Sequence, residues 1–281
     1  MFYAYKVKPG EKIKLSDYDP DDHGGVKHDD AGDELESLNE RLTALQEAQY
    51  AAGKNAVLIV LQAPDTGGKD GTISHVMAQF NPAGCRVESF KTPTPEELAH
   101  DFLWRVHRVT PPTGAIAIFN RSHYEQVLVV RVHKLEPEKV WQRHFEEINN
   151  FESLLADSGT IIMKFFLHIT KEEQRKRLLA REDDKDKSWK LSASDWPEHE
   201  LFDDYIAAYE DALTRCSTAH APWYIVPSNH KWFRNLAVAR TIADTLDPYK
   251  KAWREELEKR GKEALAASKA AREGGDSAKE S

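Results

Sequence analysis

The sequence predicts an α/β protein with a doubly wound parallel sheet that is covered by helices on both faces. Short apolar runs rich in β-branched residues alternate with longer segments of helical periodicity, which is the pattern of parallel strands joined by crossover helices. The first of these runs leads directly into a glycine-bearing loop and a helix, as in nucleotide-binding sheets. The expected strands cover residues 57–61, 86–90, 115–119, 161–169 and 223–227.

Helices are predicted between these strands from apolar spacing and end signals. Leucines recur at helical intervals after Asp33, and Thr94-Pro95 opens a helix with proline in its first turn. The expected helices cover residues 33–53, 69–80, 94–108, 137–157, 170–182, 201–216 and 231–246. We therefore divide the chain into an irregular N-terminal arm with a helix (1–53), a core (54–249), and an exposed helix with a disordered tail (250–281).

The composition indicates a soluble globular protein without nucleic-acid or membrane partners. The 281 residues carry a formal net charge of −8, which argues against broad nucleic-acid binding. No apolar run approaches the roughly 18 residues of a membrane span, and the N-terminus lacks the layout of a signal peptide. Cys85 and Cys216 are far apart and lack metal-ligand spacing, so we expect reduced thiols and a cytoplasmic location.

Residues 63–72, Ala-Pro-Asp-Thr-Gly-Gly-Lys-Asp-Gly-Thr, predict a loop that holds phosphate groups. Glycines let backbone N–H groups approach phosphate oxygens, Lys69 reaches the outer phosphates, and the following helix turns its N-terminus to the anion. The match to the G-x-x-x-x-G-K-[ST] pattern is incomplete. Ala63 replaces the first glycine, and Asp70 replaces the Ser or Thr that usually holds magnesium. An ordinary strand–turn–helix is the alternative interpretation.

Carboxylates near the two strand ends are candidates for holding magnesium. Asn120 follows the strand at 115–119, where nucleoside-triphosphate enzymes usually carry a metal-holding aspartate. Asp65 in the loop and Glu125 past the strand could replace it, because magnesium prefers hard oxygen ligands. A hydrogen bond within the loop for Asp65, and a surface salt bridge for Glu125, are the alternatives.

Basic side chains are concentrated in two segments of this acidic chain. Residues 105–144 hold seven Arg or Lys against three Glu, and the charged segment 171–190 suits a mobile lid that closes over phosphates. A solvated amphipathic helix is the alternative for this segment. The basic residues to which we assign the lid function are three arginines on one helical face and three lysines that follow them, namely Arg175, Arg177, Arg181, Lys185, Lys187 and Lys190.

Three motifs resemble the second polyphosphate kinase family. They are the loop 63–71, the strand end Phe119-Asn-Arg-Ser-His-Tyr-Glu125 with Val129-Val-Arg131, and Lys187-Ser-Trp-Lys190 followed by Asp195. The similarity extends from about Tyr5 to Leu246. It implies a P-loop kinase core similar to thymidylate kinase, with a helical lid at about 171–200. It also implies reversible phosphoryl transfer between inorganic polyphosphate and nucleotides, with Mg²⁺ as cofactor.

The Asn-Arg-Ser-His-Tyr-Glu form resembles the subgroup that acts on both AMP and ADP, and we also expect a homo-oligomer, a dimer or a tetramer. Asp65, Lys69 and Arg121 are the expected catalytic residues, and Asp65 and Glu125 the expected metal ligands. The expected phosphate and polyphosphate ligands are Gly67, Gly68, Asp70, Gly71, Thr72, Arg131, Arg175, Arg181, Lys187 and Lys190. The expected nucleotide-binding residues are Phe90, Lys91, Arg105 and Glu125.

Two other function classes remain open at this stage. An ATP-dependent nucleoside monophosphate kinase on the same fold would more often retain Ser or Thr where Asp70 stands. A non-catalytic nucleotide-binding module would have little use for a basic lid.

Overall fold

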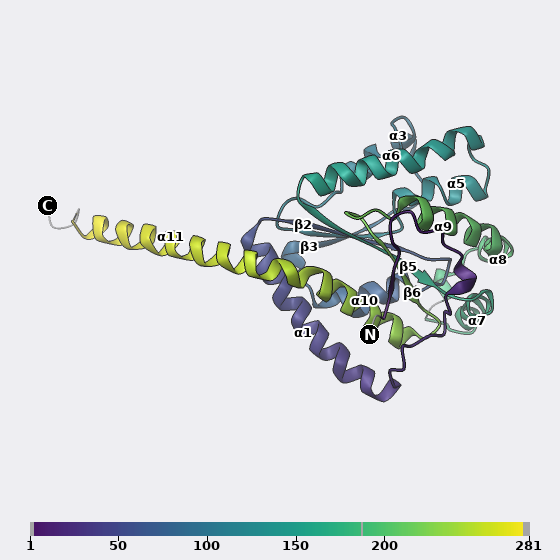
Figure 1. The fold of residues 1–281 in the computed structure, drawn as a ribbon, viewed down its shortest axis with the longest axis horizontal. Helices are drawn as coiled ribbons and strands as arrows, with labels where there is room; N and C mark the ends of the chain where they lie inside the picture. The colour runs from purple at the N-terminus through teal and green to yellow at the C-terminus, as the bar shows by residue number, and fades with distance from the viewer. Residues whose placement is uncertain (1–2, 187, 278–281) are drawn as a thin grey trace.

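A computed structural model describes residues 3–186 and 188–277 and confirms the α/β fold (Figure 1). In this part of the chain one sheet has the strand order β1-β6-β5-β2-β4-β3. Neighbouring strands run parallel except β1, which pairs antiparallel with β6, so the N-terminal arm adds an edge strand. The strands are β1 (Tyr5–Lys6), β2 (Ala56–Gln62), β3 (Cys85–Ser89), β4 (Ile116–Asn120), β5 (Thr160–His168) and β6 (Trp223–Pro227).

Helices cover both faces of the sheet, as expected for a doubly wound fold (Figure 1). Alternate residues of β2 enter different cores: Val57, Ile59 and Leu61 pack in one, while Leu58 and Val60 pack in the other. The first core includes helices α1 (His28–Ala52), α2 (Lys69–Val76) and α10 (Lys231–Leu246). The second includes α6 (Glu138–Asp157) and α9 (Phe202–Cys216). Residues of helix α1 thus pack in the same core as β2 and α10.

The central position of β2 decides where a ligand can bind. Its neighbours are β4 on one side and β5 on the other, so the chain reverses its winding direction beside β2. In open α/β sheets ligands bind at this switch point, beyond the carboxyl ends of the strands. The loop at 63–72 and the segment Asn120-Arg121 both lie at that edge.

The segment 94–108, which we predicted as one helix, forms two short helices instead, α3 (Pro95–Leu98) and α4 (Trp104–His107). The predicted start is confirmed, because the Thr94 hydroxyl accepts a hydrogen bond from the Glu97 N–H at 3.2 Å. Between the two helices the Asp101 carboxylate accepts one from the Leu103 N–H at 3.0 Å. Such a side-chain bond to the backbone competes with a continuous helix.

The predicted lid region consists of α7 (Lys171–Glu182) and α8 (Asp195–Glu200), and α11 (Lys250–Ser277) projects away from the body (Figure 1). Of the predicted tail, residues 278–281 lie outside the described residues. Among the helices that are described, none is long and apolar enough to cross a membrane. The remaining short elements are α5 (Val129–Val132) and the 3-10 turns η1 (Leu15–Asp17), η2 (Met77–Gln79), η3 (Pro82–Gly84), η4 (His123–Gln126), η5 (Ser188–Lys190) and η6 (Asp247–Tyr249).

Candidate active site

The loop after β2 has the backbone geometry of a phosphate loop. Gly68 precedes the first turn of α2 with φ +106°, a conformation that favours glycine. A Cβ atom at Gly67 would lie 2.5 Å from the Cβ of Ala63, and one at Gly68 only 1.9 Å from an Nη atom of Arg234. Both glycines are therefore required by close packing, and the start of α2 leaves backbone N–H groups available for an anion.

Lys69 is held inside this loop. Its ammonium group donates a hydrogen bond to the backbone oxygen of Ala63 at 3.0 Å, so the side chain curls back over the loop. Burial, and then the neighbouring Arg121, lower the pKa of Lys69 to about 8. The charged form of Lys69 is thus less favoured here than in water. The negative charge of a bound phosphate would raise the pKa of Lys69 again and keep its ammonium group charged.

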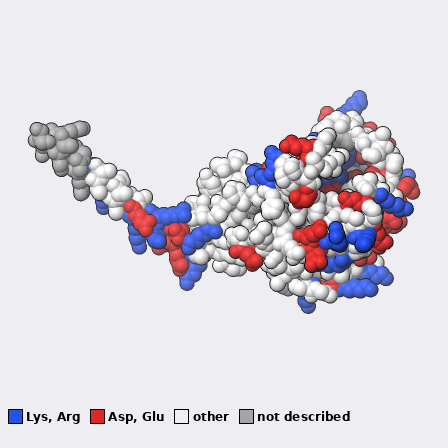
Figure 2. Space-filling model, turned by 90° about the horizontal axis from the view of Figure 1, so that it is seen from above, with Lys and Arg blue, Asp and Glu red and all other residues white. Residues whose placement is uncertain are grey.

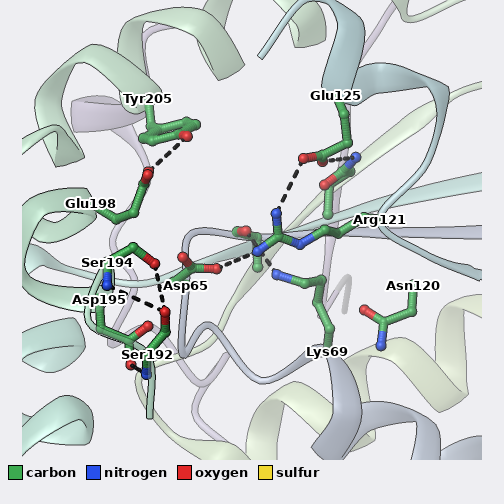
Figure 3. A network of polar contacts seen from close by, with 12 residues as sticks. Asp65, Lys69, Asn120, Arg121, Glu125, Ser192, Ser194, Asp195, Glu198 and Tyr205 are labelled. Carbon is green, nitrogen blue, oxygen red and sulfur yellow. Dashed lines mark hydrogen bonds and ion pairs between the residues drawn. The ribbon is translucent and has the colours of Figure 1, made fainter. Parts of the chain in front are cut away.

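Arg121 is the centre of the site (Figure 3). It follows β4 with φ 61°, and its backbone N–H donates to the Leu61 oxygen at 3.1 Å, which ties it to β2. Its guanidinium lies between two carboxylates, 2.7 Å from Asp65 and 3.3 Å from Glu125. Burial by itself lowers the pKa of Arg121, but Glu125 and Asp65 outweigh this and raise the pKa above its ordinary value. The guanidinium therefore remains charged.

The two residues that depart from the common P-loop pattern are partners. The side-chain amide of Asn120 donates a hydrogen bond to the Asp70 carboxylate at 2.9 Å. Relative to the common pattern, in which a hydroxyl follows the lysine and a carboxylate follows the strand, the carboxylate and the neutral group have exchanged positions. Each departure is visible in the sequence, but the contact between the two side chains depends on the fold.

Two side chains of helix α7 hold the phosphate loop in place through hydrogen bonds to its backbone. The buried Arg177 donates to the backbone oxygen of Thr66 at 3.1 Å, and Gln174 donates to that of Asp65 at 3.1 Å. Arg181, one turn further, lines the cleft, whereas Arg175 is exposed and does not line it. The prediction that all three arginines share one face is therefore wrong, because residues two positions apart lie on opposite sides of a helix.

A cavity of about 960 Å³ opens beside the loop, and its lining contains more basic than acidic side chains. On the face shown in Figure 2, charged side chains gather at the end of the body opposite α11. Among the residues that line the cavity, Asp65, Asp70 and Asp195 are outnumbered by basic side chains. These are Lys69, Arg121, Arg177, Arg181, Lys231 and Arg234. Such a surplus of positive charge suits a ligand with several phosphate groups.

Arg234 is a site residue that the sequence analysis missed. It is 3% exposed and its guanidinium donates to the Asn235 side chain at 2.8 and 3.1 Å. No carboxylate pairs with it in the described part of the chain, and burial together with Arg177 lowers the pKa of Arg234 to about 10. The available signal was an arginine within the mainly apolar segment Trp232-Phe-Arg-Asn-Leu-Ala237.

A second cavity, of about 270 Å³, lies on the other side of Arg121. Asp65, Arg121 and Ser194 line both cavities, so they stand at the junction between them. Thr92 connects the second cavity to a further hollow of about 230 Å³ after β3.

Three of the predicted nucleotide-binding residues, Phe90 and Lys91 after β3 and Arg105 on α4, line that further hollow, and the fourth, Glu125, lines the second cavity. Arg105 lies 5.0 Å from the ring centre of Phe90, donates to the backbone oxygen of Lys91 at 2.9 Å, and pairs with Glu97 at 3.3 Å. Phe90 is nearly buried, while Lys91 is exposed.

Other predicted ligands lie outside this arrangement. Arg131 pairs with Asp211 at 2.5 Å and stacks on Trp141, and it does not line the described cavities. The buried Thr72 hydroxyl donates to the Gly68 backbone oxygen at 3.1 Å, so it supports the loop. Gly71 lines the large cavity. Lys187 lies outside the described residues, as does the side chain of Lys190.

The carboxylates at Arg121 fit a metal that shares its coordination with phosphate. No group of three or more His, Cys, Asp or Glu that could hold a metal occurs in residues 3–186 and 188–277. Asp65 and Glu125 meet at Arg121, and the buried amide oxygen of Gln62, whose amide nitrogen donates to Glu125, has no hydrogen-bond partner. This donor set suits magnesium, which commonly uses one or two carboxylates together with water and substrate phosphates.

The parallel sheet, the phosphate loop and the basic lid helix define a P-loop kinase. Comparisons with known proteins agree, because the sequence model of "Polyphosphate kinase 2" matches residues 25–254. The chain therefore belongs to the polyphosphate kinase 2 family, whose members transfer phosphoryl groups between polyphosphate and nucleotides.

Named relatives are similar over nearly their whole length. An AMP/ADP-polyphosphate phosphotransferase of Meiothermus ruber is 50% identical over 247 residues, which are 86% of this chain and 92% of the relative. An ADP-polyphosphate phosphotransferase of Rhodopseudomonas palustris is 43% identical over 277 residues, 93% and 95% of the two chains. The crystal structure of polyphosphate kinase 2 from Arthrobacter aurescens TC1 superposes with a TM-score of 0.83 at 41% identity, covering 86% and 88%.

Proposed function

We propose that this enzyme transfers the terminal phosphoryl group of polyphosphate both to AMP and to ADP, reversibly and with magnesium. The observation that carries the proposal is the position of Arg121 at the junction of two cavities, one large and basic and the other smaller and mixed. The occurrence of Asn120 and Glu125 in one motif, and the name of the Meiothermus relative, support two acceptors.

The large basic cavity is the proposed donor site. Polyphosphate carries a charge on every unit, and the cavity offers Arg177, Arg181, Lys231 and Arg234 beyond the loop itself. The loop N–H groups and Lys69 would hold the outermost phosphates. Because the donor is a long anion with a charge on every unit, several arginines can each pair with a different phosphate.

The smaller cavity and the hollow after β3 form the proposed acceptor site. Lys91 and Arg105 are the cations nearest the hollow, and Thr92 connects it to Arg121 and Glu125. The acceptor phosphate would then meet the donor end at Arg121. Phe90 is nearly buried, so its proposed part is to orient Arg105.

Transfer itself needs no covalent enzyme intermediate. Lys69 and Arg121 would neutralise charge on the transferred phosphoryl group, and the two cavities would hold donor and acceptor in line, which together account for most of catalysis in this reaction class. Asp65 orients the Arg121 guanidinium, and Glu125 orients it from the acceptor side. Magnesium, held by Asp65, Glu125 and phosphate oxygens, would supply further charge neutralisation.

The decisive experiment offers AMP or ADP with magnesium and either polyphosphate or ATP as the donor. We expect ADP to form from AMP, and ATP from ADP, with polyphosphate. Transfer to AMP from ATP alone would instead identify an ATP-dependent nucleoside monophosphate kinase. Strict use of a single acceptor would contradict the part of the proposal that concerns two acceptors. A homo-oligomeric state stays a prediction, which size-exclusion chromatography with light scattering tests.

A further inference from the structure

A fully buried charged pair lies close to the turn that carries Arg121 but lines neither cavity. The side chains of Lys164 on β5 and Glu152 on α6 are both 0% exposed, and their charged atoms are 2.5 Å apart. The Lys164 ammonium group also donates to the backbone oxygen of Cys216 at 2.6 Å and to the Tyr124 hydroxyl at 2.8 Å. Its three hydrogens are thus all used.

The pair is connected to the two residues that precede Glu125. Glu152 accepts a hydrogen bond from the Tyr124 hydroxyl at 2.9 Å, and its same oxygen lies 3.2 Å from Nε2 of His123. Both residues are buried and belong to η4, the 3-10 turn between Arg121 and the end of the motif. One carboxylate in the core therefore holds two of the three side chains that lie between Arg121 and Glu125 in the sequence.

This anchoring acts on a strained backbone. Residues other than glycine rarely adopt the φ of 61° found at Arg121, and such conformations persist only where the surroundings enforce them. The next residue, Ser122, is buried, and its hydroxyl accepts hydrogen bonds from the Tyr124 N–H and from Gln62, both at 3.2 Å. The turn is thus held by a hydrogen bond within itself, by β2 through Gln62, and by Glu152 in the core.

The Glu152 carboxylate is ionised, which lets it accept the hydrogen bonds of this network. Burial alone raises the pKa of Glu152, but Lys164 and His123 outweigh it, so that the pKa lies below its ordinary value and the carboxylate stays ionised. Burial lowers the pKa of His123, which leaves its imidazole neutral at neutral pH. A buried ion pair is often no more stabilising than an apolar pair of the same size. An apolar pair, however, would offer no hydrogen bonds to His123 and Tyr124.

We propose that Lys164 and Glu152 are positioning residues for phosphoryl transfer, which hold Arg121 in place through Tyr124 and His123. The inference rests on the proposed role of Arg121 at the transferred phosphoryl group. It assigns a function to a charged pair that touches no substrate.

Tyr124→Phe tests the proposal most directly, because it removes one hydroxyl and keeps the ring against Trp223. The double variant Lys164→Met/Glu152→Gln removes both charges together. Tyr3→Phe is the matched control, since it also removes one hydroxyl, whose part-buried hydrogen bond goes to Glu34, and Tyr3 lines neither cavity. For each variant we measure the urea midpoint of unfolding, and kcat and KM for AMP with polyphosphate.

We expect kcat to fall at least about tenfold in both network variants, with KM changed by less than about threefold, because the lost interaction acts in the transition state. The control should keep its kcat at a similar urea midpoint. A folded Tyr124→Phe enzyme with kcat within about twofold of the wild type overturns the proposal. So does an equal loss of kcat in the control.

A double-mutant cycle identifies the residue through which the network acts. In the Arg121→Lys background, Tyr124→Phe should lower kcat by less than about threefold, because the group that it positions has already been replaced. If Tyr124→Phe lowers kcat by at least about tenfold in the Arg121→Lys background as well, the proposal is overturned. An Arg121→Lys enzyme with normal kcat would refute the proposed function of Arg121 itself. An impaired Arg121→Lys enzyme beside an unimpaired Tyr124→Phe enzyme refutes only the positioning role.

Discussion

Replacing Arg234 by methionine should make the free enzyme more stable and weaken its binding of polyphosphate. The Arg234 side chain is 3% exposed, lies against the phosphate loop, and has no carboxylate partner within the described residues. Burial, and then Arg177, lower the pKa of Arg234 from 12.5 to about 10. The folded protein thus holds a cation that it does not neutralise.

The size of the effect follows from that pKa. A decrease from 12.5 to about 10 corresponds to about 3 kcal/mol of penalty on the charged form. Because the pKa in the folded state lies below its value in the unfolded state, the penalty is present in full below about pH 10 and disappears as the pH rises toward 12.5. Methionine fills a similar volume but loses the hydrogen bonds to Asn235. We therefore expect a net gain in the free energy of unfolding of about 1–2 kcal/mol.

Urea unfolding at pH 7.5 without ligands measures this gain, and initial rates at saturating nucleotide measure KM for polyphosphate. We expect KM to rise at least about tenfold, because a desolvated charge-assisted contact is lost. Arg240→Met on the same helix is the control, since Arg240 pairs with Glu34 at the surface and should change stability by less than about 1 kcal/mol. A destabilised Arg234→Met enzyme with unchanged KM would refute the reasoning.

Lys69→Ala should lower kcat by about 100-fold or more without unfolding the protein, and near-normal turnover would remove the phosphate-loop assignment. Because the pKa of Lys69 is lowered to about 8, kcat/KM for polyphosphate should fall as the pH rises through 8 and the ammonium loses its charge; a profile that stays flat to about pH 9.5 contradicts this. Asp65→Asn should lower kcat about tenfold or more and raise the magnesium concentration that is needed, whereas an unchanged magnesium titration excludes a ligand role. Arg181→Ala should raise KM for polyphosphate and make KM less dependent on the salt concentration. Arg175 is exposed and does not line the cleft, so Arg175→Ala is the matched control. Equal effects of the two substitutions would refute the role of Arg181 as a phosphate contact in the cleft.

Local patterns predicted most of the secondary structure because the strands are apolar and β-branched and the turns carry glycine and proline. The strand at 57–61, the loop lysine and the helix start at Lys69 lie where the sequence indicated. The segment 94–108 was one exception, since the side chain of Asp101 competes for backbone N–H groups and divides it. Periodicity alone does not reveal such a local hydrogen bond.

The lid arginines show the limit of helical spacing. Arg175 and Arg181 were given the same role from their charge, but only Arg181 lines the cleft. A spacing of two residues separates side chains by about 200° around a helix, so that Arg177 faces inward where Arg175 faces solvent. The charge was readable from the sequence, but its direction depended on how α7 packs against the loop.

The sequence by itself determined the fold class, the phosphate loop, and Arg121 as a residue of the second strand end, because each depends on short stretches of adjacent residues. Only the tertiary structure decided which distant residues meet: Asn120 with Asp70, and Lys164 with Glu152 and Tyr124. It also placed Arg234 against the phosphate loop more than 160 residues earlier in the chain. The physical reason is that the partner of a buried charge is chosen by packing and desolvation across the sheet, and these do not follow from local periodicity.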